Sequence, residues 1–217
     1  MDFTAIDFET ATSKSTSVCS LGICVVENNR IAEQKELLFR PEPFEFNDYN
    51  IRIHGITPAD VAARETFNAY WDEIRPYLDL RLIVAHNAPF DVGALRATLD
   101  LFGLEYPTFR YLCTVILSQK AYPELPSHKL NHLCQALEIH FNHHHAMDDA
   151  YACASVLIRI CQEFHLNTPE EIVEKFGISI GSVYPGCRQD EEKRKRPRRP
   201  YRRRIVRAQS KEAAVKN

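Results

Sequence analysis

Ile6-Asp7-Phe8-Glu9-Thr10 is the stretch on which the fold and the chemistry of this 217-residue chain depend. Apolar residues precede it, so it is predicted to end a first β-strand, with Asp7 and Glu9 on one face and Phe8 on the other. The two carboxylates then lie roughly 6–7 Å apart along the strand. Paired carboxylates are costly in a packed interior unless cations neutralise them, and Mg²⁺ and Mn²⁺ prefer such oxygen ligands. The alternative is an exposed pair on an edge strand, since most Asp and Glu side chains face water.

The segments around this stretch predict a mixed sheet covered by helices. Residues 18–27 and 31–39 read as two further strands joined by an Asn-Asn turn, which makes an antiparallel meander with the first. The wholly apolar run 82–85 is typical of a buried parallel strand, and 109–113 is a further candidate strand. Helices are expected at 68–80, from 91 to about 102, at 114–121, at 128–137 and at 169–177. Another is expected to begin at the motif 143–149 and to run to about 164, and one more starts at Thr57-Pro58. The Asn- and aromatic-rich segment before Ile53 is expected to be a loop.

Two later segments each bring an acidic side chain to the face that packs on the sheet. From Asp91 the same-face positions of the helix are mostly apolar, so Asp91 opens a core-facing stripe. The positions on the same helix face as Asp149, followed over several turns, are all apolar, whereas those on the same face as Asp148 are mixed. We therefore expect Asp149 to point inward and Asp148 toward the rim.

Four converging carboxylates, Asp7, Glu9, Asp91 and Asp149, match the charge of two divalent cations. Such a pair of metals, about 3.5–4 Å apart, stabilises the attacking and leaving oxygens of a phosphodiester. The reaction also needs a group that accepts the proton of the attacking water, and histidine titrates in the right range. His144, five residues before Asp149, is the candidate.

These motifs, D-x-E-T, H-N-A-x-F-D and H-x-A-x-x-D in this order, resemble those of the DEDDh-type 3′–5′ exonucleases. That family includes the proofreading exonuclease subunit or domain of bacterial DNA polymerase III. The resemblance covers roughly residues 1–165. It implies an α/β, ribonuclease H-like fold with a mixed central sheet flanked by helices, and we take residues 1–180 as the exonuclease domain.

The resemblance also implies roles for individual residues. Asp7 would bridge two Mg²⁺ or Mn²⁺ ions, Glu9 and Asp149 would complete the site of the first, Asp91 would serve the second, and His144 would be the general base. By position, Thr10, His54, Ile56 and Phe90 resemble residues that bind the terminal nucleotide, with Ile56 and Phe90 as stacking surfaces.

Several of these residues have structural alternatives. The register at the base is open to question because His143, His144 and His145 are consecutive, and a histidine triplet can also bind stray metal at a surface. His54 is alternatively a residue that packs its own loop, and Phe90 a core residue. The pair His86-Asn87 is expected to orient the strand-to-helix turn rather than to contact substrate.

Charge divides the chain into an acidic body and a basic tail. Residues 188–217 hold 13 Lys/Arg and 4 Asp/Glu, a net of +9, which leaves 14 and 25, a net of −11, for residues 1–187. The tail lacks an apolar periodicity, so we expect 188–217 to be disordered. It is interpreted as a tether for nucleic-acid phosphates. The alternatives are a solvated tail without a role and a segment that resembles a nuclear localisation signal.

The sequence thus favours a metal-dependent exonuclease that releases nucleoside 5′-monophosphates from 3′ ends, acting on DNA, and on single strands, in repair or replication. The alternatives are an RNA-trimming exoribonuclease of the same family, a non-catalytic nucleic-acid binder, and a subunit that its tail docks to a polymerase or repair partner. Seven cysteines without a C-x-x-C pair favour reduced thiols, and no apolar run or basic leader indicates a membrane or export. We therefore expect a cytoplasmic protein.

Overall fold

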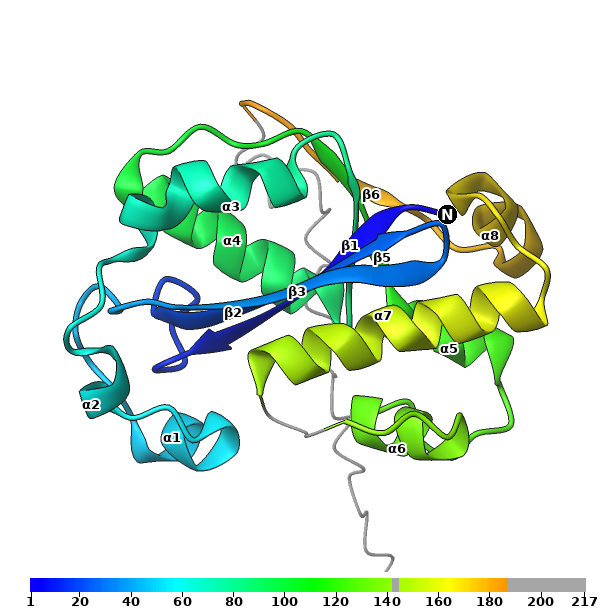
Figure 1. Cartoon of the computed structure of the whole chain (residues 1–217), viewed down its shortest axis with the longest axis horizontal. Coiled ribbons are helices and arrows are strands. Elements are labelled where there is room, and N and C mark those ends of the chain that lie inside the picture. The colour runs from blue at the N-terminus through cyan, green and yellow to red at the C-terminus, as the bar shows by residue number, and fades with distance from the viewer. Residues whose placement is uncertain (142–144, 187–217) are drawn as a thin grey trace, which may run out of the picture. The chain divides into compact units, whose positions relative to one another are not determined.

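The computed structural model describes residues 1–141 and 145–186, and a mixed sheet forms the centre of this part of the chain (Figure 1). The strand order is β3-β2-β1-β4-β5-β6. The strands are β1 (Phe3–Thr10), β2 (Val18–Glu27), β3 (Arg30–Leu38), β4 (Leu82–Ala85), β5 (Phe109–Cys113) and β6 (Gly181–Val183). The first three form the expected antiparallel meander, β4 and β5 run parallel to β1, and β6 is antiparallel to β5.

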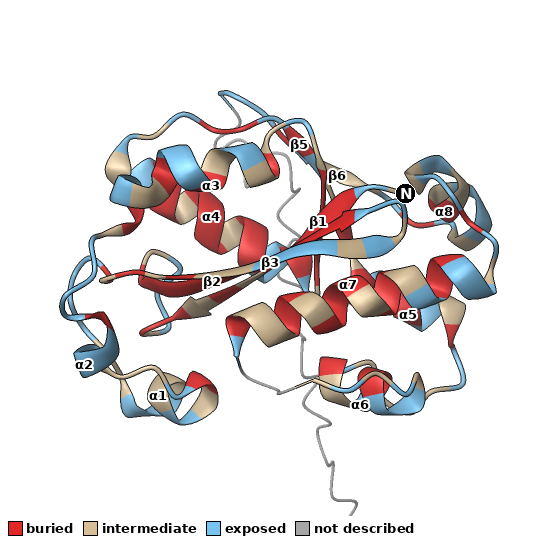
Figure 2. Ribbon diagram, viewed as in Figure 1, coloured by how far each residue is buried: buried red, intermediate tan, exposed pale blue. Residues whose placement is uncertain are grey.

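Helices cover both faces of the sheet. They are α1 (Asp48–His54), α2 (Pro58–Val61), the 3₁₀ helix η1 (Phe67–Tyr70), α3 (Trp71–Leu78), α4 (Ala88–Phe102), α5 (Thr114–Ala121), α6 (Leu130–Ala136), α7 (Ala146–Glu163) and α8 (Pro169–Phe176). One core lies between the sheet and α5 to α8, and the other between the sheet and α3, α4 and η1. Figure 2 shows buried positions along β1, α4 and α7. The predicted α/β architecture is confirmed.

The alternation of β1 decides which core receives which side chain. Phe3 and Ala5 contribute to the core under α7, while Ile6 and Phe8 contribute to the core under α4. Asp7 and Glu9 continue the Phe3–Ala5 face toward the end of the strand. The same strand therefore builds both cores and carries two acids on the α7 side. The alternative of an edge-strand pair is wrong, because β1 lies between β2 and β4.

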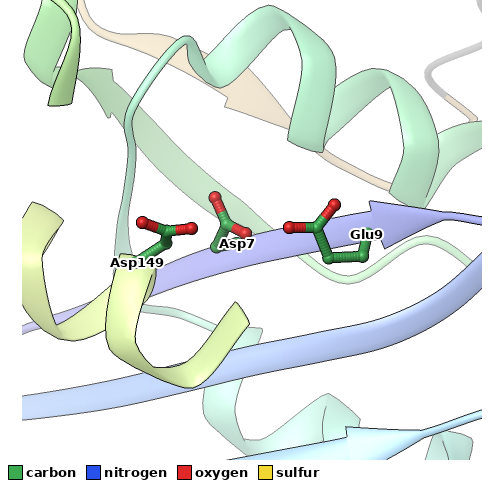
Figure 3. Close-up of side chains that lie close together, drawn as sticks. All are labelled: Asp7, Glu9 and Asp149. Atoms are coloured by element: carbon green, nitrogen blue, oxygen red, sulfur yellow. The ribbon is translucent and has the colours of Figure 1, made fainter. Parts of the chain in front are cut away.

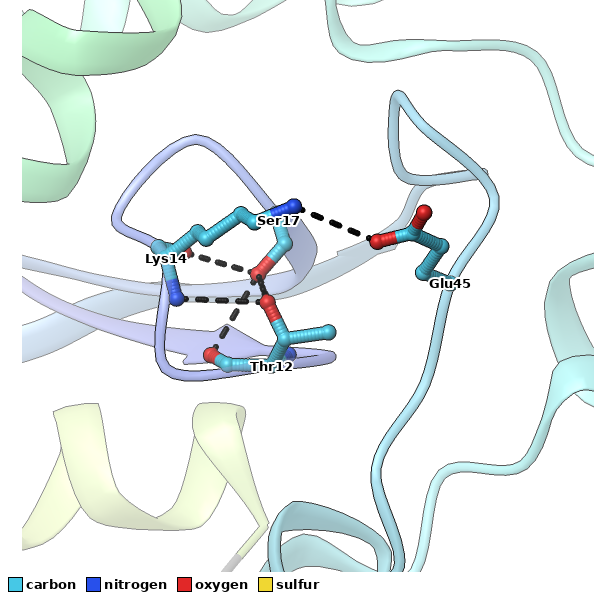
Figure 4. Close-up of polar contacts among 4 residues, drawn as sticks. All are labelled: Thr12, Lys14, Ser17 and Glu45. Atoms are coloured by element: carbon cyan, nitrogen blue, oxygen red, sulfur yellow. Dashed lines mark hydrogen bonds and ion pairs between the residues drawn. The ribbon is translucent and has the colours of Figure 1, made fainter.

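The turns follow the local sequence. Asn28 and Asn29 both have positive φ, 52° and 60°, as a type I′ hairpin turn requires. The Thr57-Pro58 helix start is confirmed, with a capping box between Thr57 and Asp60. The loop after β1 is closed by Ser17, whose hydroxyl lies 2.9 Å from that of Thr12 and donates to Lys14 O at 2.7 Å (Figure 4).

The segment before Ile53 was expected to be a loop, and that expectation is wrong because residues 48–54 form α1. Asn47 caps this short helix by accepting the Asn50 N–H at 2.8 Å, and Gly55 ends it at φ 75°. The expected helix at 68–80 is divided into η1 and α3 and ends at Leu78, since Leu80 has φ 59°. Strand β6 had no counterpart in the sequence analysis.

Among the described helices, none is both long and apolar enough to cross a membrane. The six cysteines in the described ranges are free, and all except Cys113 are buried. Cys187 lies outside the described residues.

Candidate active site

The acidic motifs converge at one point on the α7 side of the sheet. The carboxylates of Asp7 and Glu9 on β1 and of Asp149 on α7 offer oxygen atoms that all lie within 4.8 Å of one another. Figure 3 shows the three side chains directed toward each other. Asp149 is 5% exposed, whereas Asp148 is only half-buried, so the predicted inward orientation of Asp149 is confirmed.

A glycine allows α7 to approach the sheet closely at this point. Gly22 on β2 pairs with Asp7 in the sheet register. A Cβ atom at Gly22 would lie 1.9 Å from Ala146 O and 2.5 Å from Met147 N, far inside any real contact distance. The first turn of α7 therefore rests on bare backbone, and this close contact brings Asp149 within reach of Asp7.

Asp91 approaches the same region from α4. It is 1% exposed, and its Oδ1 accepts the Phe8 N–H at 3.0 Å. The turn before it depends on Asn87, which adopts a left-handed conformation with φ 75°. Asp91 does not belong to the group of three carboxylates, but its charge is the second cause, after burial, that raises the pKa of Asp7.

Burial and mutual repulsion together disfavour ionisation of these acids. Burial, followed by the charges of Asp91, Glu9 and Asp149, raises the pKa of Asp7 well above its usual value. Burial and then Asp149 raise the pKa of Glu9 to about 8. Burial raises the pKa of Asp91 to about 8, although the hydrogen bond from Phe8 N opposes the shift. A site built in this way favours bound cations or protons.

The acids open into a pocket with a volume of about 750 Å³. The described residues that line it include Asp7, Glu9, Asp149, Ile53 of α1, Phe90 of α4, and the segment from Pro126 to Asn131 that leads into α6. Phe90 is 43% exposed, so it is a pocket residue and the core alternative is wrong. The pocket is large enough to hold a nucleotide-sized ligand.

His86 and Asn87 hold the turn beside the acids, as expected. The His86 Nε2–H donates to His128 O at 3.0 Å, and its Nδ1 lies 2.9 Å from Thr114 Oγ1. His128 Nδ1 in turn lies 3.1 Å from Ser118 Oγ. The end of β4 is thus linked to α5 and to the segment before α6. Both residues of the pair also line the pocket.

Thr10 and His54 lie in a hydrogen-bonded corner next to the pocket. The His54 Nε2–H donates to Thr10 O at 3.2 Å, and Nδ1 accepts the Ile56 N–H at 3.0 Å. Asn50 Nδ2 also donates to Thr10 O, at 2.6 Å. Thr10, His54 and Ile56 are not among the described residues that line the pocket, whereas Ile53 is. The packing role considered for His54 is therefore present in the structure.

His144 and His143 lie outside the described residues. Their neighbour His145 is half exposed, with Nε2 at 3.3 Å from Glu36 and Nδ1 at 4.0 Å from Asp148. These contacts place His145 beside acidic groups at the rim. The role of His144 stays a prediction from the motif.

Sequence reasoning missed three contributors to the site. Gly22 lies in an ordinary-looking strand, and its role becomes visible only when α7 is placed on the sheet. Ile53 was missed because the segment before it was taken as a loop, although Asn47 and Gly55 are typical caps. The segment 126–131 carries Ser, His, Lys and Asn side chains before a helix, but nothing in the sequence indicated which surface it would face.

Comparisons with known proteins place the chain in a family. The family model RNase_T, described as an exonuclease, matches residues 4–157. The chain is 28% identical over 165 residues to the 3′-5′ exonuclease DinG of Bacillus subtilis, covering 74% of this chain and 18% of that protein. It is 28% identical over 166 residues to a DNA polymerase III PolC-type of Halalkalibacterium halodurans, covering 75% and 11%. The chain thus corresponds to less than a fifth of the length of either relative.

Solved structures show the same fold. Exonuclease X in complex with 5′ overhanging duplex DNA is similar with a TM-score of 0.63 and 26% identity, covering 81% of this chain and 99% of that one. The nuclease domain of 3′hExo, a DEDDh family member bound to rAMP, has a TM-score of 0.66 and 18% identity, with coverage of 77% and 94%. The second likeness supports the fold alone. Together they confirm the expected ribonuclease H-like fold.

Proposed function

This chain belongs to the RNase_T family of exonucleases, and from that premise we propose that it is a metal-dependent 3′–5′ exonuclease. It would hydrolyse the last phosphodiester bond of a nucleic acid, DNA being favoured, and release nucleoside 5′-monophosphates. The observation that carries the proposal is the group of three carboxylates within 4.8 Å at the floor of a nucleotide-sized pocket, with Asp91 buried beside them.

The side chains present fit divalent cations. The donor set consists of carboxylate oxygens, which hard ions such as Mg²⁺ and Mn²⁺ prefer. Burial raises the pKa values of Asp7, Glu9 and Asp91, and repulsion between the acids adds to the shift for Asp7 and Glu9; bound cations would relieve both effects. Asp7 would bridge two ions, with Glu9 and Asp149 completing the site of the first and Asp91 serving the second.

Bound at this position, divalent ions supply Lewis-acid stabilisation of the phosphate charge and lower the pKa of a coordinated water. The protein residues orient the substrate and move the proton. Phe90 and Ile53, which line the pocket, offer apolar surface to the terminal base and sugar. His144, by its place in the H-x-A-x-x-D motif, would accept the proton of the attacking water.

Degradation of end-labelled substrates tests this function directly. We expect 5′-labelled single-stranded DNA to shorten one nucleotide at a time with Mg²⁺ or Mn²⁺, to yield 5′-mononucleotides, and to stay intact with chelator or in Asp7→Asn. Duplex DNA and short RNA, assayed in parallel, determine substrate preference. Folded wild-type protein that releases nothing from any of them in either metal contradicts the proposal.

The histidine register has its own test. We expect His144→Ala to lower kcat by roughly 10²–10⁴, the usual effect of losing a general base. His143→Ala is the matched control, since it removes an adjacent ring, and it should keep near-normal kcat. The reverse pattern would transfer the role of base to His143.

The basic residues 188–217 lie outside the described chain, and their proposed role rests on charge. The net of +9 would offset repulsion between nucleic acid and a body of net −11. Removing them should weaken binding and make its salt dependence shallower, whereas a segment that docks a polymerase or repair partner would leave activity on naked substrate unchanged. We also propose that residues 1–180 are the exonuclease domain and that the protein acts in the cytoplasm.

A further inference from the structure

The segment from Pro126 to Asn131 is a second wall of the same pocket. It joins α5 to α6, far in sequence from the acids on β1 and α7, yet it lines the pocket together with them. Its residues, Pro, Ser, His, Lys, Leu and Asn, include no acidic side chain. Lys129 is the only Lys or Arg among the described residues that line the pocket, and it is exposed.

The backbone of this wall is fixed relative to the acids. His86, at the end of β4, donates from Nε2 to the carbonyl oxygen of His128 at 3.0 Å. The other His86 nitrogen lies 2.9 Å from Thr114 Oγ1, and His128 Nδ1 lies 3.1 Å from Ser118 Oγ. The residue next to Lys129 is thus tied to β4 and α5. A lysine on a backbone fixed in this way loses less freedom when it binds than one on a free loop.

The charges of the pocket separate into two places. The three clustered carboxylates require cations before they can accept a phosphate, and the scissile phosphate belongs there if the proposed function holds. Every further nucleotide brings one more phosphate, and the acids repel it. Among the described lining residues, Lys129 carries a positive charge on a flexible side chain that can donate hydrogen bonds to a phosphate.

From these observations we propose that Lys129 binds the backbone phosphate on the 5′ side of the scissile one. This rests on the proposed exonuclease function and deepens it. The wall would make the enzyme prefer polynucleotide chains with at least two phosphodiesters over a single-phosphate ester. The contact is to the backbone, so it would be independent of base sequence.

Two substrates separate this role from a general effect on the site. Thymidine 5′-(p-nitrophenyl phosphate) has a scissile phosphodiester and no further phosphate. A 5′-labelled oligothymidylate has a scissile phosphodiester and further phosphates on its 5′ side. We expect Lys129→Ala to lower kcat/KM on the oligonucleotide by about ten- to a hundredfold more than on the ester, as for a lost charged hydrogen bond. The salt slope of log KM for the oligonucleotide should become shallower by about 0.7.

Two further variants serve as controls. Lys129→Arg keeps the charge and should retain most of the selectivity for the oligonucleotide. Lys120→Ala removes an exposed lysine from α5 outside the pocket lining and should change neither substrate. Equal losses on ester and oligonucleotide, or an unchanged salt slope in Lys129→Ala, overturn the proposal. Wild-type protein inactive on both substrates is a different result, since it overturns the exonuclease function itself.

Discussion

Two neighbouring regions at the end of β1 differ in the polar groups that they bring together. The acid cluster of Asp7, Glu9 and Asp149 gathers negative charge within 4.8 Å, and its members have raised pKa values where a shift is resolved. One residue further on, Thr10 begins the hydrogen-bonded corner, where Thr10 O accepts hydrogen bonds from both Asn50 and His54. The first region concentrates acids that repel one another, while in the second region backbone oxygens accept hydrogen bonds from neighbouring side chains.

This difference assigns the reaction to the acid cluster and a structural role to the hydrogen-bonded corner. Gathering like charges in a buried place is costly, so a protein retains such a cluster where a ligand completes it. A corner whose donors and acceptors already pair gains little from a ligand and instead holds the end of β1 in place. Sequence motifs placed both regions in the substrate site, and only the structure distinguishes them.

Neutralising one acid gives the largest expected effect. Asp149→Asn keeps the size of the side chain and removes its charge, so we expect kcat to fall by at least about 10³, beyond the loss of a single oxyanion donor. The melting temperature in chelator should rise by about 2–4 °C, which is the shift for 1 kcal/mol in a chain of this size, because Asp149 repels Asp7 and Glu9.

Asp148→Asn is the matched control, since the adjacent half-buried carboxylate lies at the rim. It should keep kcat within a few-fold of wild type. The contrast between the two regions would fail if Asp149→Asn lowered the melting temperature in chelator, since the acids would then be stabilising without metal.

Moving α7 is the next largest perturbation. Gly22→Ala places a methyl group against Ala146 O and must displace the first turn of α7, together with Asp149. A shift of about 1 Å can cost 10² in rate, and the melting temperature should also fall. Gly93→Ala in α4, with nothing within 4 Å of an added Cβ, should retain activity and the melting temperature, since alanine favours helix over glycine. Equal activity in the two variants would show that the close contact with β2 does not position Asp149.

The sequence permitted prediction of the first five strands, of the antiparallel meander formed by the first three, and of the inward orientation of Asp149. These follow from local periodicity: β1 alternates, and α7 has an apolar stripe beginning at Asp149. Gly22, Ile53 and Lys129 were not predictable as site residues in this way. Their roles depend on which distant segment lies against them, and a single sequence carries no direct signal of that contact.

Metal-free stability should depend on pH in a way that distinguishes the cluster from the corner. The folded-state pKa values of Glu9 and Asp91 are raised to about 8, above their unfolded values near 4. Their contribution to stability is therefore fully present below pH 4 and is lost as the pH rises toward 8. We expect the melting temperature in chelator to fall between pH 5 and pH 8.5, and Mg²⁺ to raise it most at the high end.

Asp149→Asn tests the origin of that slope, because it removes one repelling charge and should make the decline shallower. Thermal scans with chelator and with Mg²⁺ at each pH provide the measurement. A melting temperature that does not change with pH in chelator would mean that the acids are neutralised within the protein.

The smallest effect on activity is expected in the corner. Asn50→Ala removes the Nδ2 donor that lies 2.6 Å from Thr10 O and 3.3 Å from Thr12 O. Thr10 O keeps the hydrogen bond from His54, so the free energy of unfolding should fall by only about 1–2 kcal/mol. Because Asn50 is not among the described residues that line the pocket, kcat and KM should both stay within about threefold of wild type. A KM raised tenfold or more with unchanged stability would instead make the corner part of the nucleotide site, as the motif resemblance implied for Thr10 and His54. The substrate site would then extend past the end of β1 to include this corner.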